Sequence, residues 1–145
     1  MRTIGGNGVG RINIEFEVAN YDDLVLVRRK LLRPSQVRRK TVPGVVDSGA
    51  ATFVLPKAVV KELGVPMTRS VKVRYADGRR GQRKETAGVQ IEILGRQATF
   101  SAVVEPKRET AQIGAIVLEA LDLLVDCKEQ RVVPRDPSGP VFEIE

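Results

Sequence analysis

The stretch Val45–Leu55, which reads VVDSGAATFVL, contains a short polar turn between two apolar runs. Asp47, Ser48 and Gly49 are residue types that favour turns, and alone they are typical of an exposed Asx turn. The flanking residues change this interpretation, because a turn between two apolar strands has buried residues on both sides. A carboxylate held there must be paired or hydrogen-bonded, since an isolated buried charge is very costly. Asp47 is therefore the first candidate for a functional carboxylate.

The N-terminal side of this stretch predicts strands. Arg11–Val18 alternates apolar and polar residues and is expected to form a half-buried strand. We expect Ala19–Asp23 to turn and Leu24–Val27 to form a short strand that completes a hairpin. The basic segment 28–40 contains Pro34 and is expected to be a loop.

The C-terminal side predicts more strands and two short helices. Pro56 and Gly64 bracket an apolar run as helix start and stop signals do. A tight turn is expected at Asp77-Gly78, between strands. The other expected elements are strands at Val71–Tyr75, Val89–Leu94, Gln97–Val104, Leu123–Cys127 and Arg131–Val133, a helix at Ala115–Leu121, and a possible last strand at Val141–Ile144.

These elements predict a mostly β protein with one or two short helices. Its 145 residues are 42% apolar, enough for one domain with a real core. We expect a flexible Gly-rich N-terminus at residues 1–10, one domain at 11–134, and a Pro/Gly-rich tail at 135–145 that could supply a dimer strand.

Composition excludes several classes of chemistry. The chain has no histidine, which removes Ser-His-Asp triads, Cys-His dyads and histidine-ligated metals. A carboxylate mechanism leads by elimination, and no metal or cofactor is expected. Cys127 is the only cysteine, so it forms no intramolecular disulfide, and we expect it to be a small buried hydrophobe.

The sequence also indicates where the protein is located and which partners to expect. No signal-peptide core and no apolar run of membrane-spanning length is present, so we expect a cytoplasmic protein with no membrane contact. The net charge is +6, concentrated in residues 28–40 and 79–84. Solvated loops explain these groups best. Because no aromatic residues alternate with the charges as in base-stacking surfaces, nucleic acid is an unlikely partner.

Four segments resemble the retropepsin-like, clan AA aspartic proteases, and they occur in the family's order over residues 42–134. VVDSGAATFVL resembles the active-site segment, and QIEILGRQATFSAVV at 90–104 resembles two strands joined at a glycine. Ile113-Gly114 resembles the second motif, which opens a short helix. DLLVDCKEQRVVP at 122–134 is similar to the closing strands of bacterial members. The resemblance implies a closed β-barrel, the half-fold of acid proteases.

The resemblance also implies a function. The chain is expected to be an aspartic endopeptidase that cleaves polypeptides as a homodimer, with one Asp47 from each subunit. Ser48 would lock the two active-site loops together, Gly49 would present its N–H to the carboxylate, and Ala50 would leave room beside it. A flap, the hairpin that covers the cleft in this family, is expected at Lys72–Thr86. Its tip residues, expected to bind substrate, are Tyr75, Ala76, Asp77, Gly78 and Arg79.

Two departures from the family pattern keep alternatives open. The second motif usually continues with an arginine that ties the dimer, but Ala115 follows Gly114 here. The flap is basic, with Arg79, Arg80 and Arg83, which favours acidic residues near the scissile bond. One alternative is a non-catalytic protease-like domain that dimerises or binds peptides. A second is a basic nucleic-acid-binding β domain.

Overall fold

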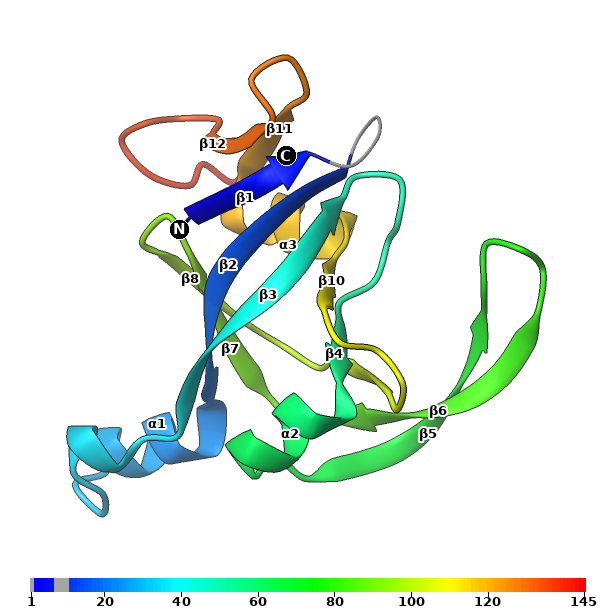
Figure 1. Ribbon diagram of the computed structural model, residues 1–145. Helices are drawn as coiled ribbons and strands as arrows, with labels where there is room; N and C mark the ends of the chain where they lie inside the picture. Colours follow the sequence, from blue (N-terminus) through cyan, green and yellow to red (C-terminus); the bar gives the residue numbers. More distant parts are fainter. Residues whose placement is uncertain (1, 7–10) are drawn as a thin grey trace.

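The computed structural model describes residues 2–6 and 11–145, and these residues are mostly β (Figure 1). The strands are β1 Arg2–Gly6, β2 Arg11–Asn20, β3 Arg39–Asp47, β4 Val54–Pro56, β5 Met67–Arg74, β6 Arg80–Thr86, β7 Val89–Ile93, β8 Arg96–Phe100, β9 Val103–Glu105, β10 Ala111–Ile113, β11 Leu123–Asp126 and β12 Arg131–Pro134. The helices are α1 Tyr21–Arg28, α2 Lys57–Leu63 and α3 Ala115–Leu121, with a 3-10 turn at Pro34–Gln36. The predicted fold class is confirmed.

Ten strands form one sheet in the order β5-β6-β9-β4-β10-β3-β2-β7-β8, with β1 paired to β2. Two pairs are parallel: β10 beside β3, and β4 beside β9. Strand β10 lies between β3 and β4 in the sheet, although β4 ends at residue 56 and β10 begins only at residue 111. Strands β11 and β12 form a separate hairpin. This order places the chain's two predicted motifs side by side.

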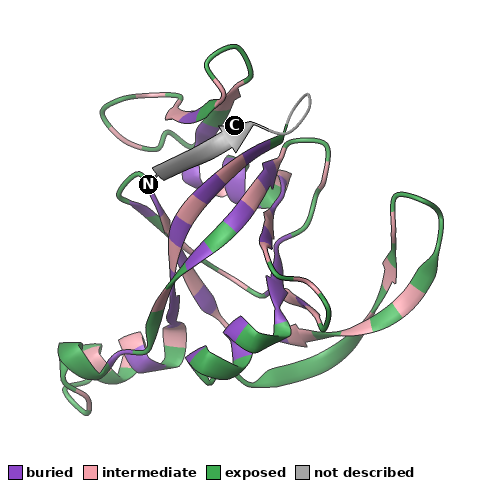
Figure 2. Ribbon diagram, in the orientation of Figure 1, coloured by how far each residue is buried: buried purple, intermediate pink, exposed green. Residues whose placement is uncertain are grey.

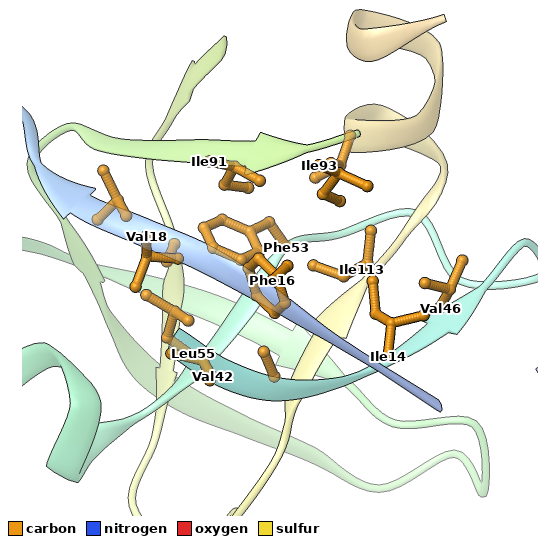
Figure 3. Packing of buried hydrophobic residues seen from close by; sticks show 14 of the residues in the cluster. Ile14, Phe16, Val18, Val42, Val46, Phe53, Leu55, Ile91, Ile93 and Ile113 are labelled. Carbon is orange, nitrogen blue, oxygen red and sulfur yellow. The ribbon is translucent and has the colours of Figure 1, made fainter. Parts of the chain in front are cut away.

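The core is built from the alternating strands that the sequence predicted. In β2 the inward residues Ile12, Ile14, Phe16 and Val18 are each at most 3% exposed. Figure 3 shows Ile14, Phe16 and Val18 packed with residues of β3, β4, β7 and β10. Gly44 of β3 has no room for a side chain, because a Cβ there would lie 2.8 Å from the Phe16 ring. Burying each such large apolar side chain contributes about 1.5–3 kcal/mol.

The segment after β2 differs from the prediction. Tyr21–Arg28 forms helix α1, where we expected a turn and then a strand, so the structure has one helix more than predicted. The Asn20 side chain accepts a hydrogen bond from the Asp23 backbone N–H at 3.1 Å and caps the helix. Two aspartates in the first turn and Arg28 in the last complement the helix dipole. These capping residues outweigh the short apolar run on which the strand prediction rested.

Asp23 then ties α1 to the entrance of β3. Its carboxylate is buried and accepts two hydrogen bonds from the Arg38 guanidinium, both at 2.9 Å. These hydrogen bonds lower the pKa of Asp23 below its ordinary value. A lowered carboxyl pKa stabilises the fold at neutral pH, and that contribution is lost as the pH falls through the lowered value.

The chain ends differ in part from expectation. Within the predicted flexible N-terminus, Arg2–Gly6 forms strand β1, and residues 1 and 7–10 lie outside the described residues. The tail Val141–Ile144 is not a strand in the single chain. It is anchored where it begins, because buried Asp122 accepts hydrogen bonds from Arg135 Nε at 2.6 Å and from the Val141 N–H at 3.0 Å. The hydrogen bond from Arg135 also lowers the pKa of Asp122.

Two smaller findings complete the fold. Cys127 is exposed, contrary to the prediction, because it lies in the turn between β11 and β12 and not in the strand. No helix in the described part of the chain has the length and apolar character needed to cross a membrane.

Candidate active site

Asp47 lies at the end of β3, where the strand leaves the core and turns. The flanking residues are buried as predicted: Val46 is 0% and Phe53 1% exposed. Ser48 and Gly49 are exposed, and Ala50 is half-buried. The Asp47 Oδ1 atom accepts a hydrogen bond from the Gly49 N–H at 3.0 Å, and the Ala50 N–H bonds the Asp47 carbonyl at 3.1 Å. The turn therefore fixes the carboxylate through backbone hydrogen bonds and leaves 22% of the Asp47 side chain exposed.

The second predicted motif meets this turn directly. Strand β10 runs parallel to β3, with Ile113 beside Val46. Gly114 follows, and helix α3 begins at Ala115. The first N–H groups of α3 bond the carbonyls after the turn, Ala115 N to Ala50 O at 2.8 Å and Ile116 N to Ala51 O at 3.1 Å. The helix start and the Asp47 loop thus support each other's backbone.

Gly114 is required for this contact by packing and not by its backbone angles, since its φ is −89°. A Cβ at this position would lie 2.5 Å from the Ala51 carbonyl carbon and 2.6 Å from the Thr52 nitrogen. Both are backbone atoms, so no side chain can rotate away. The glycine lets α3 approach the loop that carries Asp47.

Substitution Gly114→Ala is therefore expected to destabilise the protein by at least about 2 kcal/mol, as forced overpacking does. The free energy of unfolding, measured by denaturant titration, would report it. Gly81→Ala is the matched control, because a Cβ there meets side-chain atoms at ordinary contact distance, Arg83 Nη1 at 3.4 Å and Val73 Cγ2 at 3.9 Å, and no backbone atom within 4 Å is among its nearest neighbours. Equal unfolding midpoints for the two variants would contradict the packing role of Gly114.

Two arginines near Asp47 escaped the sequence analysis. Strand pairing places Arg11 opposite Asp47, and Arg11 Nε lies 3.3 Å from Asp47 Oδ2. Arg108, in the loop before β10, is half-buried, and desolvation lowers its pKa. The charges of Glu105, Arg11 and Asp47 also act on the Arg108 guanidinium. Arg11 is placed by the register of β2 against β3, and Arg108 by the path of the 106–110 loop. No local sequence pattern encodes either of these, so the sequence did not reveal the two arginines.

The predicted hairpin forms, and Asp77-Gly78 lies in its turn. Strands β5 and β6 pair antiparallel, and the Tyr75 N–H bonds the Arg79 carbonyl at 2.8 Å. Gly78 has a φ of 88°, which explains a glycine there. The hairpin begins at Met67, before the predicted Lys72, and projects from the body (Figure 1). In the described residues no hydrogen bond or ion pair joins its turn, residues 75–79, to the Asp47 loop.

The hairpin has two unlike faces. Alternate residues of both strands are half-buried on one face and exposed on the other, and most of the hairpin's surface is exposed in Figure 2. The half-buried face carries Val71, Val73, Tyr75, Gly81 and Arg83, and the exposed face carries Lys72, Arg74, Arg80, Gln82 and Lys84.

Two of the hairpin arginines have carboxylate partners within the chain, and their predicted role in substrate binding stays a prediction. Arg79 is paired with Asp77, with Nε 2.7 Å from Oδ2, and Arg83 is paired with Glu105. Each already has an internal carboxylate partner. Arg80 is the third arginine that we expected to favour acidic substrate residues, and it lies on the exposed face of the hairpin.

Comparisons with known proteins agree with this geometry. Residues 34–118 match the family model described as aspartyl protease. The fold is similar to a retropepsin-like aspartic protease from Rickettsia conorii, with a TM-score of 0.50, 17% identity, and coverage of 86% of this chain and 82% of that one. It is also similar to the retroviral protease-like domain of Ddi1 from Leishmania major, with a TM-score of 0.50, 20% identity, and coverage of 67% and 81%. No curated protein gives a significant match.

Proposed function

The chain belongs to the aspartyl protease family, and from this premise we propose that it is an aspartic endopeptidase whose active site forms between two copies. The observation that carries the proposal is the placement of Asp47. Its side chain is half-buried, with 22% exposed, on a turn braced by α3 and by the Gly49 N–H. A reacting carboxylate needs this combination of access and fixed position.

The chemistry follows from two such carboxylates brought together. Like charges at close range cannot both ionise, so the pair holds one proton and titrates as a unit. The ionised Asp47 takes a proton from water as that water attacks the peptide carbonyl carbon. The protonated Asp47 donates its proton to the carbonyl oxygen. The Asp47 that took the water proton then gives it to the amide nitrogen, the other Asp47 takes back a proton from a hydroxyl of the tetrahedral intermediate, and the C–N bond breaks to release the amine and the acid. No metal or histidine takes part.

A second subunit is needed because the sequence contains one Asp-Ser-Gly. Exposed apolar side chains near the site support a contact between copies. Ile116, beside the Asp47 loop at the start of α3, is 54% exposed. In the tail, Phe142 is 64% and Ile144 92% exposed. A two-fold axis through the loops would bury the first, and pairing of the tails would bury the others.

We further propose that the substrate is an extended polypeptide with acidic side chains near the scissile bond. Arg108, whose guanidinium feels the charge of Asp47, and Arg80, on the exposed face of the hairpin, supply the complementary positive charge, whereas Arg11 is already paired with Asp47. This proposal predicts that cleavage sites are enriched in Asp and Glu.

The function is tested by mapping new termini with mass spectrometry after incubating the chain with a mixture of unfolded polypeptides. Cleavage is expected at micromolar enzyme concentration, and more at acid than at alkaline pH because the pair must keep its proton. Absence of new termini at every condition between about pH 4 and pH 8 would contradict an endopeptidase.

A non-catalytic peptide-binding domain is the second candidate, and the Arg11–Asp47 ion pair favours it. Both oxygens of Asp47 have partners in the single chain, Gly49 on Oδ1 and Arg11 on Oδ2. This reading predicts binding of the same acidic peptides without any cleavage. Fluorescence anisotropy with a labelled peptide, followed by mass analysis of that peptide, separates the two candidates.

A further inference from the structure

Glu105, the last residue of β9, lies at the centre of a cluster of hairpin side chains. The Tyr75 hydroxyl donates toward both carboxylate oxygens, at 3.0 Å to Oε1 and 2.9 Å to Oε2. The Arg83 guanidinium pairs with the same carboxylate through Nε. The Glu105 side chain is only 20% exposed and that of Arg83 31%. A shielded carboxylate with two partners is a built feature and not an incidental surface pair.

The Tyr75 ring is held from its face as well as at its hydroxyl. The Cζ atoms of Arg79 and Arg83 lie 5.0 and 5.7 Å from the ring centroid, within cation–π range. Burial and the hydrogen bond to Glu105 raise the pKa of Tyr75. The hydroxyl therefore keeps its proton and remains a donor over the neutral range.

The register of the hairpin explains how one carboxylate reaches both partners. Val71 pairs with Arg83 and Val73 with Gly81, so Tyr75 and Arg83 lie on the same face. Gly81, opposite Val73, lies between them on that face, and a Cβ there would lie 3.4 Å from Arg83 Nη1. The cluster thus spans the outer half of the hairpin.

The attachment of the hairpin to the body is otherwise confined to its base. Strand β6 pairs with β9 at Lys84 and Glu85. Beyond those positions, the hydrogen bonds that join the hairpin's described residues to the body all end on Glu105. Glu105 also opens the loop that carries Arg108, whose guanidinium feels the charges of both Glu105 and Asp47. One carboxylate therefore connects the hairpin to the loop that carries Arg108.

We propose that Glu105, with Tyr75 and Arg83, is a latch that sets the position of the β5–β6 hairpin, and that Glu105 is a positioning residue for substrate capture. The second half of this inference rests on the proposed function. With the latch closed, the hairpin keeps one position relative to the 106–110 loop. When the latch is broken, the hairpin moves about its base. Part of the binding free energy of a peptide is then used to order the hairpin.

Hydrogen exchange of the hairpin amides tests the latch without any reference to catalysis. Glu105→Gln is expected to speed exchange of residues 75–83 by about tenfold, because it removes a charged acceptor from two hydrogen bonds. Tyr75→Phe should act in the same direction. Glu109→Gln is the matched control, since it removes an exposed carboxylate from the same loop. Exchange in Glu105→Gln equal to that in Glu109→Gln would overturn the latch.

Two further variants separate a latch from a merely structural role. Arg83→Lys keeps the charge and should restore slow exchange relative to Arg83→Gln, whereas Arg80→Gln, on the opposite face, should leave the hairpin unchanged. With a cleavable peptide, Glu105→Gln should raise KM several-fold and change kcat little. An unchanged KM would remove the positioning role.

The results also distinguish the latch from the proposed function. If the latch variants exchange faster and the wild type cleaves no peptide, the latch stands and the endopeptidase is wrong. If the wild type cleaves peptides and neither exchange nor KM changes in Glu105→Gln, the endopeptidase stands and the latch is wrong.

Discussion

Replacing Asp47 by asparagine is expected to lower kcat for peptide cleavage by at least about a thousandfold, since it removes the general acid and base together. The fold should persist. The asparagine Oδ1 can still accept from the Gly49 N–H, and the lost pair with Arg11 is a surface ion pair in which Arg11 is 57% exposed. The measurement is the steady-state rate on a peptide containing a mapped cleavage site, beside a thermal melt of each protein.

Asp22→Asn is the matched control, because it removes a carboxylate from an exposed position in the first turn of α1. Its rate should equal that of the wild type. Wild-type turnover by a purified Asp47→Asn protein would show that another group carries the reaction.

Specific activity is expected to fall on dilution, because the active site needs an Asp47 from each of two chains. Well below the dimer dissociation constant, each tenfold dilution should reduce specific activity about tenfold by mass action. The dimer is expected to be weak, since Ala115 replaces the arginine that ties related dimers. Activity and sedimentation should be followed over the same concentration range.

Mixing provides a sharper form of this test. At concentrations above the dimer dissociation constant, a ninefold excess of Asp47→Asn chains should leave roughly a tenth of the wild-type activity, because random pairing places most wild-type chains in mixed dimers. The same excess of an unrelated protein is the control. Constant specific activity down to low nanomolar concentration, with a monomeric mass, would contradict the two-chain site.

Local patterns in the sequence predicted the frame of the site. The apolar runs beside Asp47, the alternation in β2, the Asp-Gly turn and the bracketing of α2 by Pro56 and Gly64 each depend on neighbours only a few residues away. These patterns hold because strand burial, turn angles and helix ends are decided over such short distances. The resemblance of four ordered segments then predicted how they assemble.

Prediction failed where a local pattern competed with a cap. The apolar run Leu24–Val27 favoured a strand, but Asn20 and the two acidic residues after it start a helix there. Cys127 was expected in a strand and lies in the turn that follows it. In both cases the apolar residues alone did not decide the outcome. The capping hydrogen bonds and the position of the turn decided it.

The sequence by itself determined that this is a mostly β chain with one Asp-Ser-Gly turn, no histidine chemistry, and a glycine at residue 114. Only the tertiary structure decided what surrounds Asp47 and what holds the hairpin. Arg11 meets Asp47 through the register of β2 against β3, and Tyr75 meets Glu105 across 30 residues. Such pairs depend on the register of strands and on the path of loops between distant segments. No short stretch of sequence encodes that register or that path.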